Sequence, residues 1–249
     1  MARIFITGSA DGLGRLAAEL LVRQGHRVVL HARNQKRAQE ALQRVPGAED
    51  VLTADLASIE ATKQLAAAAN ALGRFDAVIH NAGINRGSGQ EMLAVNTLAP
   101  YILTCLIQRP QRLVYLRSGM HLQGDPALEK ITSRPGKVSY SDTKFYMVLL
   151  AKAVARLWPD VYANAVNPGW LPTKMGGPGA PDDLEQGAET QAWLAVSSDA
   201  GAKVSGRYFF HKREARVHPE ADNIALQDEL LAACERITGV RFPATGSTS

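Results

Sequence analysis

A tyrosine and a lysine four residues apart are the residues of this chain best suited to proton chemistry. The stretch "YSDTK" contains Tyr140 and Lys144, and on a helix this spacing puts both side chains on one face, one turn apart. A free tyrosine has a pKa of about 10, so it exchanges protons poorly at neutral pH. Lowering that pKa by ~3 units requires roughly 4 kcal/mol, much of which a partly buried cation can supply. The pair is a candidate acid/base, although such pairs also occur by accident on surfaces.

A glycine-rich loop near the start of the chain has the composition of a phosphate-binding turn. The stretch "TGSADGLG" (7–14) follows a short apolar run and opens a helical pattern. Glycines there permit a tight turn and let the backbone approach a pyrophosphate group at the helix N-terminus. A structural turn without a ligand is the alternative for such a loop taken alone. Its position between the first strand and the first helix favours a dinucleotide site.

Short apolar runs alternate with longer helical patterns, and these elements must position the loop and the tyrosine. Because the strands are continuously apolar, both faces of the sheet are expected to be covered. The order of elements predicts an α/β fold in a single domain over residues 1–240, with a doubly wound, parallel, seven-stranded sheet and helices on both faces. Strands are predicted at 3–7, 26–31, 50–54, 76–80, 112–117, 162–167 and 206–211. Helices are predicted at 13–24, 34–44, 58–72, 90–108, 140–157, 183–197 and 226–240.

Two long connections and the C-terminal end depart from this alternation of strands and helices. Residues 119–139 and 172–190 follow the carboxyl ends of strands. Open α/β sheets bind ligands at that edge, so we expect both segments to border a substrate site. Plain surface loops are the alternative. Residues 241–249 are predicted to form a flexible tail.

Composition excludes several classes of function. The 249 residues are 46% hydrophobic, which is enough for one sizeable core, and no apolar run is long enough to span a membrane. The net charge is +4 but the basic residues are scattered, so no nucleic-acid surface is expected. The two cysteines lack metal-ligand spacing, and the first residues lead directly into a strand, so a cytoplasmic protein without a secretory signal is expected. The six histidines show no metal-binding pattern, and no metal is predicted.

Four motifs carry a resemblance to a known family. In sequence order they are the glycine loop, "HNAG" (80–83), "YSDTK" (140–144) and "NPGWLPT" (167–173). Together they resemble the short-chain dehydrogenase/reductase family from about residue 3 to residue 211. The resemblance implies a Rossmann-like fold and an oxidoreductase that interconverts a carbonyl and an alcohol by hydride transfer. It implies that Tyr140 is the acid/base and that Lys144 lowers its pKa.

The resemblance also implies a serine at the end of the fifth strand, which here is Ser118 and would polarise the substrate oxygen. Two departures from the family accompany it. Arg117 stands where the family usually has a first serine, and the family's usual serine-to-tyrosine spacing would fall on Ala127, which has no hydroxyl. Residues 119–139 are therefore interpreted as an insertion. The less favoured alternatives to Ser118 are Ser133, Ser139 and Ser141.

The fourth catalytic residue implied by the resemblance is Asn96, within "VNTLAP" (95–100). In the family such an asparagine distorts its helix locally, and a water molecule bound there relays protons to the lysine. A polar residue that is merely packed in a helix is the alternative.

The end of the second strand indicates which dinucleotide is bound. Proteins that prefer NAD usually place an Asp or Glu here for the ribose 2′-hydroxyl, but this chain has Ala32 followed by Arg33. An arginine pairs with a 2′-phosphate through its fork of donors, unless Arg33 is merely solvated. Like charges ~4 Å apart cost roughly 4 kcal/mol at an effective dielectric of 20, so an arginine in place of an acid changes the preference strongly. We therefore predict NADP(H), with Arg15 as a candidate second contact.

Motif positions imply the other cofactor contacts. Asp55 would receive the adenine amino group, Asn81 would hold neighbouring strands together, and Gly83 would allow the cofactor to approach closely. Lys144 would bind the nicotinamide ribose, and Thr173 would lie near the carboxamide. The predicted cofactor-binding residues are Gly8, Ser9, Asp11, Gly12, Leu13, Gly14, Arg33, Asn34, Asp55, Leu56, Asn81, Ala82, Gly83, Tyr140, Lys144, Pro168, Gly169 and Thr173.

Substrate and partners are less constrained. A small-molecule carbonyl or alcohol is expected, in an apolar chamber whose candidate residues lie next to the motifs: Met120, His121, Trp170, Leu171 and Met175. Family members are mostly dimers or tetramers joined by the helices after the fourth and fifth strands, so a homodimer or homotetramer is expected. The apolar stretch 145–157 is compatible with that contact.

Three rival functions make different demands on the sequence. A non-catalytic NADP(H)-sensing regulator on the same fold would usually have lost the tyrosine or the lysine, whereas this chain keeps both. A nucleotide-sugar epimerase would need a longer chain with an added substrate domain. A nucleic-acid binder would show strongly salt-dependent association.

Overall fold

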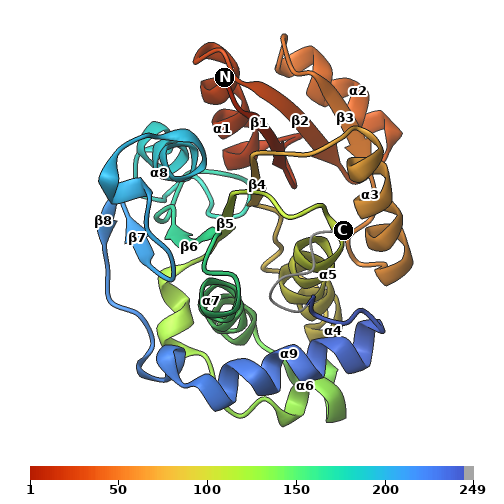
Figure 1. The fold of residues 1–249 in the computed structure, drawn as a ribbon, viewed down its shortest axis with the longest axis vertical. Helices are drawn as coiled ribbons and strands as arrows, with labels where there is room; N and C mark the ends of the chain where they lie inside the picture. Colours follow the sequence, from red (N-terminus) through yellow and green to blue (C-terminus); the bar gives the residue numbers. More distant parts are fainter. Residues whose placement is uncertain (244–249) are drawn as a thin grey trace.

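The strands of the described residues, 1–243, form one sheet in the computed structural model (Figure 1). The sheet has eight strands in the order β3-β2-β1-β4-β5-β6-β7-β8. All neighbours pair in parallel except β7 and β8, which are antiparallel. Since the strand order reverses direction between β1 and β4, a crevice is expected between the ends of these strands. The strands are β1 (Arg3–Ile6), β2 (Arg27–Ala32), β3 (Asp50–Thr53), β4 (Ala77–His80), β5 (Arg112–Leu116), β6 (Tyr162–Asn167), β7 (Tyr208–Phe210) and β8 (Arg213–Glu214).

The predicted doubly wound sheet is confirmed, but the predicted number of seven strands is wrong. The eighth strand, β8, consists of two exposed charged residues. It is reached through His211 and Lys212, whose φ angles of 48° and 62° turn the chain back along β7. A strand this short and this polar has neither an apolar run nor an alternating pattern, so the sequence gives no signal for it.

Helices cover both faces of the sheet (Figure 1). Successive strand residues point to opposite faces: Ile4 belongs to the core that α1, α2 and α8 cover, and Phe5 belongs to the core that α3, α5, α7 and α9 cover. This explains why the strands are apolar throughout. The helices are α1 (Gly12–Arg23), α2 (Gln35–Arg44), α3 (Ile59–Ala71), α4 (Gly89–Leu93), α5 (Ala99–Leu106), α6 (Glu129–Ser133), α7 (Tyr140–Leu157), α8 (Leu184–Val196) and α9 (Ile224–Thr238).

One predicted helix, 90–108, is interrupted. A π-helical turn, Ala94–Leu98, lies between α4 and α5. Asn96 at its centre is 1% exposed and turns its carboxamide to the backbone of Ile84, in the segment that follows β4. Pro100 lies in the first turn of α5, directly after the π-helical turn. The expected distortion of the helix at Asn96 is therefore confirmed.

The segment 119–139 packs against α7. It contains a 3₁₀ turn (Gly119–Gln123), α6 and a second 3₁₀ turn (Pro135–Lys137). Lys130 of α6 bridges Asp125 and Asp142, at 2.8 Å and 3.0 Å, and so ties the segment to the first turn of α7. Close contact at Gly124 completes the docking, because a Cβ there would lie 2.4 Å from the Cβ of Phe145.

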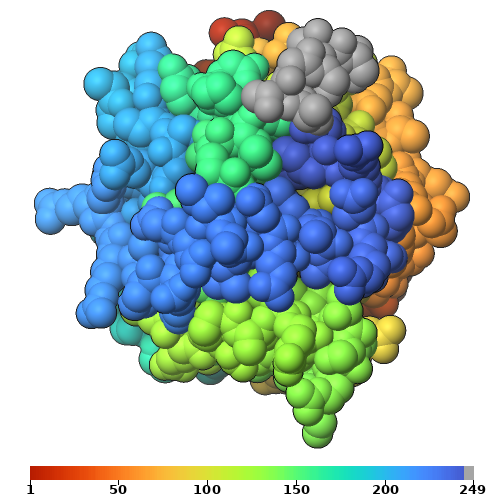
Figure 2. Space-filling view, turned by 60° about the horizontal axis from the view of Figure 1, so that its bottom comes forward, coloured from red at the N-terminus to blue at the C-terminus, as the bar shows by residue number. Residues whose placement is uncertain are grey.

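The C-terminal helix α9 also packs along α7, and Figure 2 shows α9 in blue across this side of the molecule with the 119–139 segment in yellow-green beside it. Residues Phe145, Tyr146 and Leu149 of α7 are consequently fully buried within the chain. These three side chains of the apolar stretch 145–157 therefore pack inside the chain.

Within the 172–190 connection, residues from Leu184 onward belong to α8, which agrees with the helix predicted at 183–197. Residues 241–243, expected to start a flexible tail, are packed: the rings of Phe242 and Trp158 have centroids 5.0 Å apart, and Trp158 Nε1 donates to Pro243 O at 3.3 Å. Residues 244–249 lie outside the described part. Within residues 1–243, no helix is both long and apolar enough to cross a bilayer.

Substituting Gly124 by alanine tests the docking of the 119–139 segment on α7. The added methyl group would meet the Cβ of Phe145 at 2.4 Å, so we expect a loss of about 1–3 kcal/mol in the free energy of unfolding. Gly136→Ala is the matched control, because its added methyl group would have no atom within 4 Å among residues 1–243 other than those of its chain neighbours. Urea unfolding of both variants measures the difference, and equal stabilities would contradict the close packing.

Candidate active site

A cavity of about 1230 Å³ opens at the carboxyl ends of the parallel strands. Its walls come from the loops that follow β1, β2, β3, β4, β5 and β6 and from the start of α7. Pockets for a single small molecule usually measure about 300–1,000 Å³. The cavity can therefore hold a dinucleotide together with a second molecule.

The Asn81 carboxamide joins the glycine loop to the end of β4. Its Nδ2 donates to Thr7 O at 2.9 Å and to Gly8 O at 3.0 Å. Gly14 packs directly against the Asn81 side chain, because a Cβ on Gly14 would lie 2.3 Å from Asn81 Nδ2. Gly8 adopts φ 65° against Ala82, where a side chain would be both strained and obstructed. These contacts fit the scaffold role expected for Asn81 and bring the loop backbone to the edge of the cavity.

The His31 imidazole holds the same loop from β2. Its Nδ1 accepts from Gly8 N–H at 2.9 Å, and its Nε2 lies 3.1 Å from Ala54 O, so the proton is placed on Nε2. Burial lowers the pKa of His31 to about 4. The loop is therefore built on the neutral form of this histidine, a contact that the sequence analysis did not anticipate.

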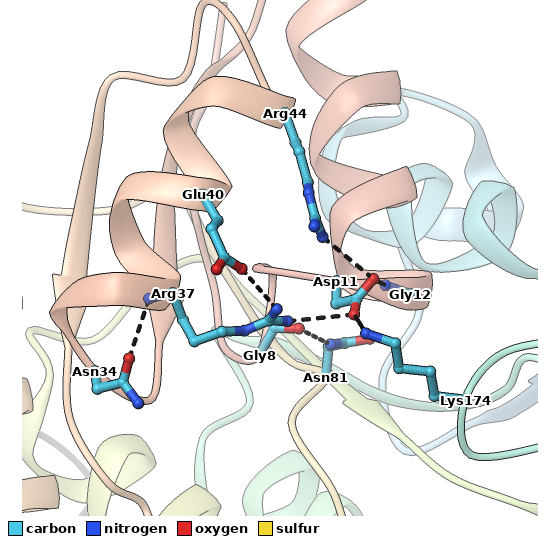
Figure 3. Close-up of polar contacts among 9 residues, drawn as sticks. All are labelled: Gly8, Asp11, Gly12, Asn34, Arg37, Glu40, Arg44, Asn81 and Lys174. Carbon is cyan, nitrogen blue, oxygen red and sulfur yellow. Dashed lines mark hydrogen bonds and ion pairs between the residues drawn. The ribbon is translucent and has the colours of Figure 1, made fainter.

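Asp11 caps α1 and lies among three cations (Figure 3). Its carboxylate accepts from Gly12 N–H at 2.9 Å and pairs with Lys174, with Arg37 at 3.2 Å and with Arg44 at 3.7 Å. The hydrogen bond from Lys174 is the largest of the influences that lower the pKa of Asp11 to about 2. Lys174 comes from the loop after β6, so this ion pair joins that loop to the glycine loop.

Arg33 and Asp55 lie together where the adenine half of a dinucleotide is expected. Arg33 donates to one Asp55 oxygen from Nη2 at 2.7 Å and from Nε at 3.0 Å. The Arg33 side chain is 73% exposed, so it can turn toward a ligand. Ala32 before it is buried, and Asn34 caps α2 by accepting from Arg37 N–H at 3.0 Å.

Tyr140 and Lys144 occupy one face at the start of α7, as their spacing predicts. The helix begins at Tyr140 because Ser139 and Asp142 form a capping box, with Asp142 N–H donating to Ser139 Oγ at 3.1 Å. Lys144 Nζ lies 5.2 Å from the centre of the Tyr140 ring. Ser118, which follows β5, lines the same cavity as Tyr140, whose hydroxyl lies 4.0 Å from Met175 Sδ.

The pKa of Tyr140 is raised, contrary to the expectation that Lys144 lowers it. Burial is the larger influence and raises the pKa, whereas the Ser118 hydroxyl, which donates to the phenolate, lowers it. Lys144 does not offset the burial, because burial, and next the Arg117 charge, lower the pKa of Lys144 itself to about 7. An amine that is neutral for part of the time stabilises a phenolate less than a permanent cation.

Asn96 and Gly83 bring a second layer of groups against Lys144. Asn96 Oδ1 accepts from Ile84 N–H at 2.8 Å, and its Nδ2 donates to Thr143 Oγ1 at 3.0 Å. A Cβ on Gly83 would lie 3.2 Å from Lys144 Nζ and 3.3 Å from Asn96 Oδ1. The absence of a side chain at Gly83 therefore leaves space beside both groups.

The outer part of the cavity is lined by exposed apolar side chains. Met120, Trp170 and Met175 are 44%, 59% and 40% exposed, and Leu171 also lines this region. His121, expected among them, is buried instead, with its Nδ1 donating to Ser118 O at 2.9 Å. Its ring packs against another aromatic ring rather than facing the cavity.

Most predicted site residues line the cavity. The exceptions among the predicted catalytic, cofactor-binding and chamber residues are Ser9, Gly14, Asn34, Asn96 and His121. Ser9 is fully buried and donates to Ile6 O at 2.9 Å, so its side chain fixes the loop. His31, Asn85 and Lys174 line the cavity without having been predicted as cofactor-binding residues. A histidine near the end of β2 was the sequence signal that could have identified His31. No sequence signal indicates the contact between Lys174 and Asp11.

Comparison with known proteins gives consistent matches. Residues 2–107 match the sequence model of a family described as short chain dehydrogenase. Over 98% of this chain, 48% of aligned residues are identical to an uncharacterized oxidoreductase of Emericella nidulans, covering 99% of that protein. The short-chain dehydrogenase chyC of Penicillium rubens is 43% identical, over 98% of this chain and 100% of that one. A solved structure of an uncharacterized Mycobacterium paratuberculosis protein shares the fold, with a TM-score of 0.82 at 22% identity, over 98% of this chain and 95% of that one.

The pKa of His31 makes the stability of the loop depend on pH. Because this pKa lies below the ordinary value of 6.5, the unfolded chain takes up the proton first, and the stabilisation present above pH 6.5 is lost as the pH falls toward 4. We expect His31 to account for roughly 2 kcal/mol of the loss in unfolding free energy by pH 5. Urea unfolding between pH 7 and 5 should show that the free energy of unfolding declines less in His31→Asn than in the wild type, because asparagine does not titrate.

His211→Asn is the matched control for this measurement, since His211 lies in the β7–β8 turn, away from the glycine loop. The free energy of unfolding of this variant should fall with decreasing pH by the same amount as that of the wild type. A His31→Asn variant with the wild-type decline would contradict the assignment.

Proposed function

Because the chain belongs to the short-chain dehydrogenase/reductase family, we propose that it is an NADP(H)-dependent oxidoreductase that interconverts a carbonyl and an alcohol. The single observation that carries the proposal is the meeting of Ser118, Tyr140 and Lys144 in one cavity with the glycine loop. A proton donor, a hydrogen-bond donor and a phosphate-binding turn are the parts that reduction of a carbonyl requires.

The residues present fit a nicotinamide dinucleotide. The backbone of Gly8 and Gly12 lines the cavity beside the N-terminus of α1, where an anion is favoured. Asp55 and Leu56 line its adenine end, and Pro168, Gly169 and Thr173 line the end near Tyr140. When bound, the nicotinamide supplies a hydride to the carbonyl carbon or accepts one from the alcohol.

The proton chemistry belongs to Tyr140 and Ser118. Tyr140 gives its phenolic proton to the oxygen of a carbonyl substrate as negative charge develops there, and Ser118 donates a hydrogen bond to the same oxygen. In the oxidative direction the Tyr140 phenolate removes the proton from the alcohol. Burial keeps the pKa of Tyr140 raised, so the protonated phenol is the prevailing form at neutral pH, which suits reduction.

Lys144 and Asn96 act around this centre. Lys144 binds the nicotinamide ribose hydroxyls, and its ammonium form stabilises the phenolate when the phenol has given up its proton. Asn96, beside Lys144 at Gly83, holds a water molecule through which Lys144 exchanges protons with solvent. The contacts of Gly83 with both side chains support this path.

The preference for NADP(H) rests on the charges at the end of β2. Ala32 leaves no carboxylate there to repel a 2′-phosphate, and Arg33 is exposed and adjacent. Arg37 and Lys174 add positive charge beside the glycine loop. The 2′-phosphate would compete with Asp55 for the Arg33 guanidinium, and a doubly charged phosphate is the stronger partner.

Tyr140→Phe tests the catalytic assignment. Removing the phenolic proton should lower kcat by at least about 100-fold, while the Kd for NADPH, measured by fluorescence, should stay within about 2-fold. Tyr146→Phe is the matched control, because Tyr146 is a buried tyrosine of the same helix whose hydroxyl has no hydrogen-bond partner within residues 1–243. An active Tyr140→Phe variant would exclude the role of Tyr140. NADPH binding by the wild type without turnover of any carbonyl or alcohol would favour a regulatory sensor instead.

Arg33→Ala tests the cofactor assignment. Loss of a charge-assisted pair with the 2′-phosphate should weaken NADPH binding roughly 10- to 100-fold, whereas NADH binding should change by less than about 3-fold, since NADH has a hydroxyl at that position. Calorimetric titration of both cofactors measures this difference. Arg23→Ala, at the far end of α1, is the control and should alter neither affinity. Equal losses for NADPH and NADH in Arg33→Ala would refute the preference.

A further inference from the structure

Arg117 is a buried guanidinium next to the catalytic residues. It directly follows β5, and its backbone N–H still donates to Val166 O of β6 at 2.7 Å, so its position is fixed by the sheet. Since side chains alternate along a strand, Arg117 points to the same face as Tyr115, toward α7. The side chain is 3% exposed.

No acidic group balances this charge within the described residues. The ionisable groups that act on Arg117 are the phenols of Tyr208 and Tyr115. Burial raises the pKa of Tyr208 to about 12 and also raises that of Tyr115, so both phenols are neutral at physiological pH. Burial lowers the pKa of Arg117 as well, but a guanidinium stays charged under such conditions.

The hydrogen bonds of Arg117 connect it to the catalytic helix. Nη1 donates to the backbone oxygen of Lys144, while Nε and Nη2 have no partner among the described residues. A buried, unpaired cation is costly to a fold. Its one strong contact is with the helical turn that carries the active-site lysine, and the residue that follows it is Ser118.

The surroundings of Lys144 contain few other charges. Tyr140 lies on the same helix, and Asn96 and Gly83, which come from the neighbouring elements, are uncharged. His121, from the 3₁₀ turn after β5, is neutral because burial lowers its pKa to about 4.

Further along α7, charged groups from other elements are already paired. Asp222 pairs with Lys152 and Asp228 with Arg156, and Lys130 of α6 pairs with Asp142. Arg117 is therefore the permanent charge that acts most directly on Lys144, next to the effect of burial.

We propose that Arg117 is a positioning residue for the reaction: it ties the strand end that carries Ser118 to the helical turn that carries Lys144, and it places a fixed positive charge behind the Lys144 amine. The inference rests on the proposed function and adds a residue to it. Through its charge, Arg117 makes Lys144 release its proton more readily, so the lysine can pass a proton on near neutral pH instead of holding it permanently. Through its hydrogen bond, it keeps Ser118 and Tyr140 at a constant separation.

Ionisation of Lys144 can be followed without turnover, by NMR of protein labelled with lysine-13Cε. The Lys144 signal is assigned by its loss in Lys144→Met. In the wild type it should titrate near pH 7. In Arg117→Gln the midpoint should rise by about one unit, because a neighbouring like charge has gone. In Arg117→Lys, which keeps a positive charge, most of the wild-type midpoint should be restored.

Turnover gives a second readout. Arg117→Gln should lower kcat roughly 10-fold with KM changed less than about 3-fold, and its kcat–pH profile should move in the same direction as the Lys144 midpoint. Arg117→Lys should recover the profile but not the full kcat, since an ammonium group lacks the fork of the guanidinium.

Arg112→Gln is the matched control for a purely structural effect. Arg112 starts the same strand and donates to the backbone oxygens of Leu194 at 2.9 Å and Ser197 at 2.7 Å. Its loss should reduce stability without moving the Lys144 midpoint.

A Lys144 midpoint unchanged in Arg117→Gln would overturn the proposal, as would an equal shift in Arg112→Gln. If Arg117→Gln does not fold, Arg117→Met takes its place under the same criteria. Should no substrate be turned over, the proposed function fails while the NMR titration still decides whether Arg117 acts on Lys144.

Discussion

The active-site crevice depends on the join that the Asn81 carboxamide makes between the ends of β1 and β4. One side chain bonds to Thr7 O and Gly8 O and lies against Gly14, so the glycine loop can adopt only the path that brings its backbone to the cavity. The strand order reverses at this point, and the loops on either side therefore diverge and leave space between them. The neutral His31 ring fixes the same loop from β2. Asn81 and His31 therefore position the backbone of the glycine loop for a ligand without having to contact that ligand themselves.

At the other end of the crevice, burial and charge act against each other. Burial makes Tyr140 harder to ionise and Lys144 easier to neutralise, so neither side chain has its ordinary acidity. The expectation that the lysine acidifies the tyrosine treated the lysine as a permanent cation. In the folded protein the permanent cation is Arg117, one layer further in and bonded to the Lys144 carbonyl. The proton transfer that we propose would therefore depend on three basic or phenolic groups rather than on one pair.

The parts of the fold that repeat along the chain could be predicted from the sequence, and contacts between distant residues could not. Continuous apolar strands predicted the parallel sheet, and the capping box at Ser139 makes α7 begin where the Tyr140–Lys144 spacing required. No local pattern indicates β8, because this strand is held by pairing with β7. The distortion at Asn96 was expected only from the family resemblance, and the bonds of Asn96 to Ile84 hold it. The partners of Arg117 and Lys174 are likewise set by tertiary packing. An arginine in place of a serine was visible at position 117, but not the carbonyl that it would reach.

The ion pair between Lys174 and Asp11 joins residues 163 positions apart and connects the loop after β6 to the cap of α1. The Lys174 side chain is 83% exposed, so mobile ions reach the pair freely and weaken it as their concentration rises. The contribution of this pair to holding the loop after β6 against the cap of α1 therefore falls as the salt concentration rises.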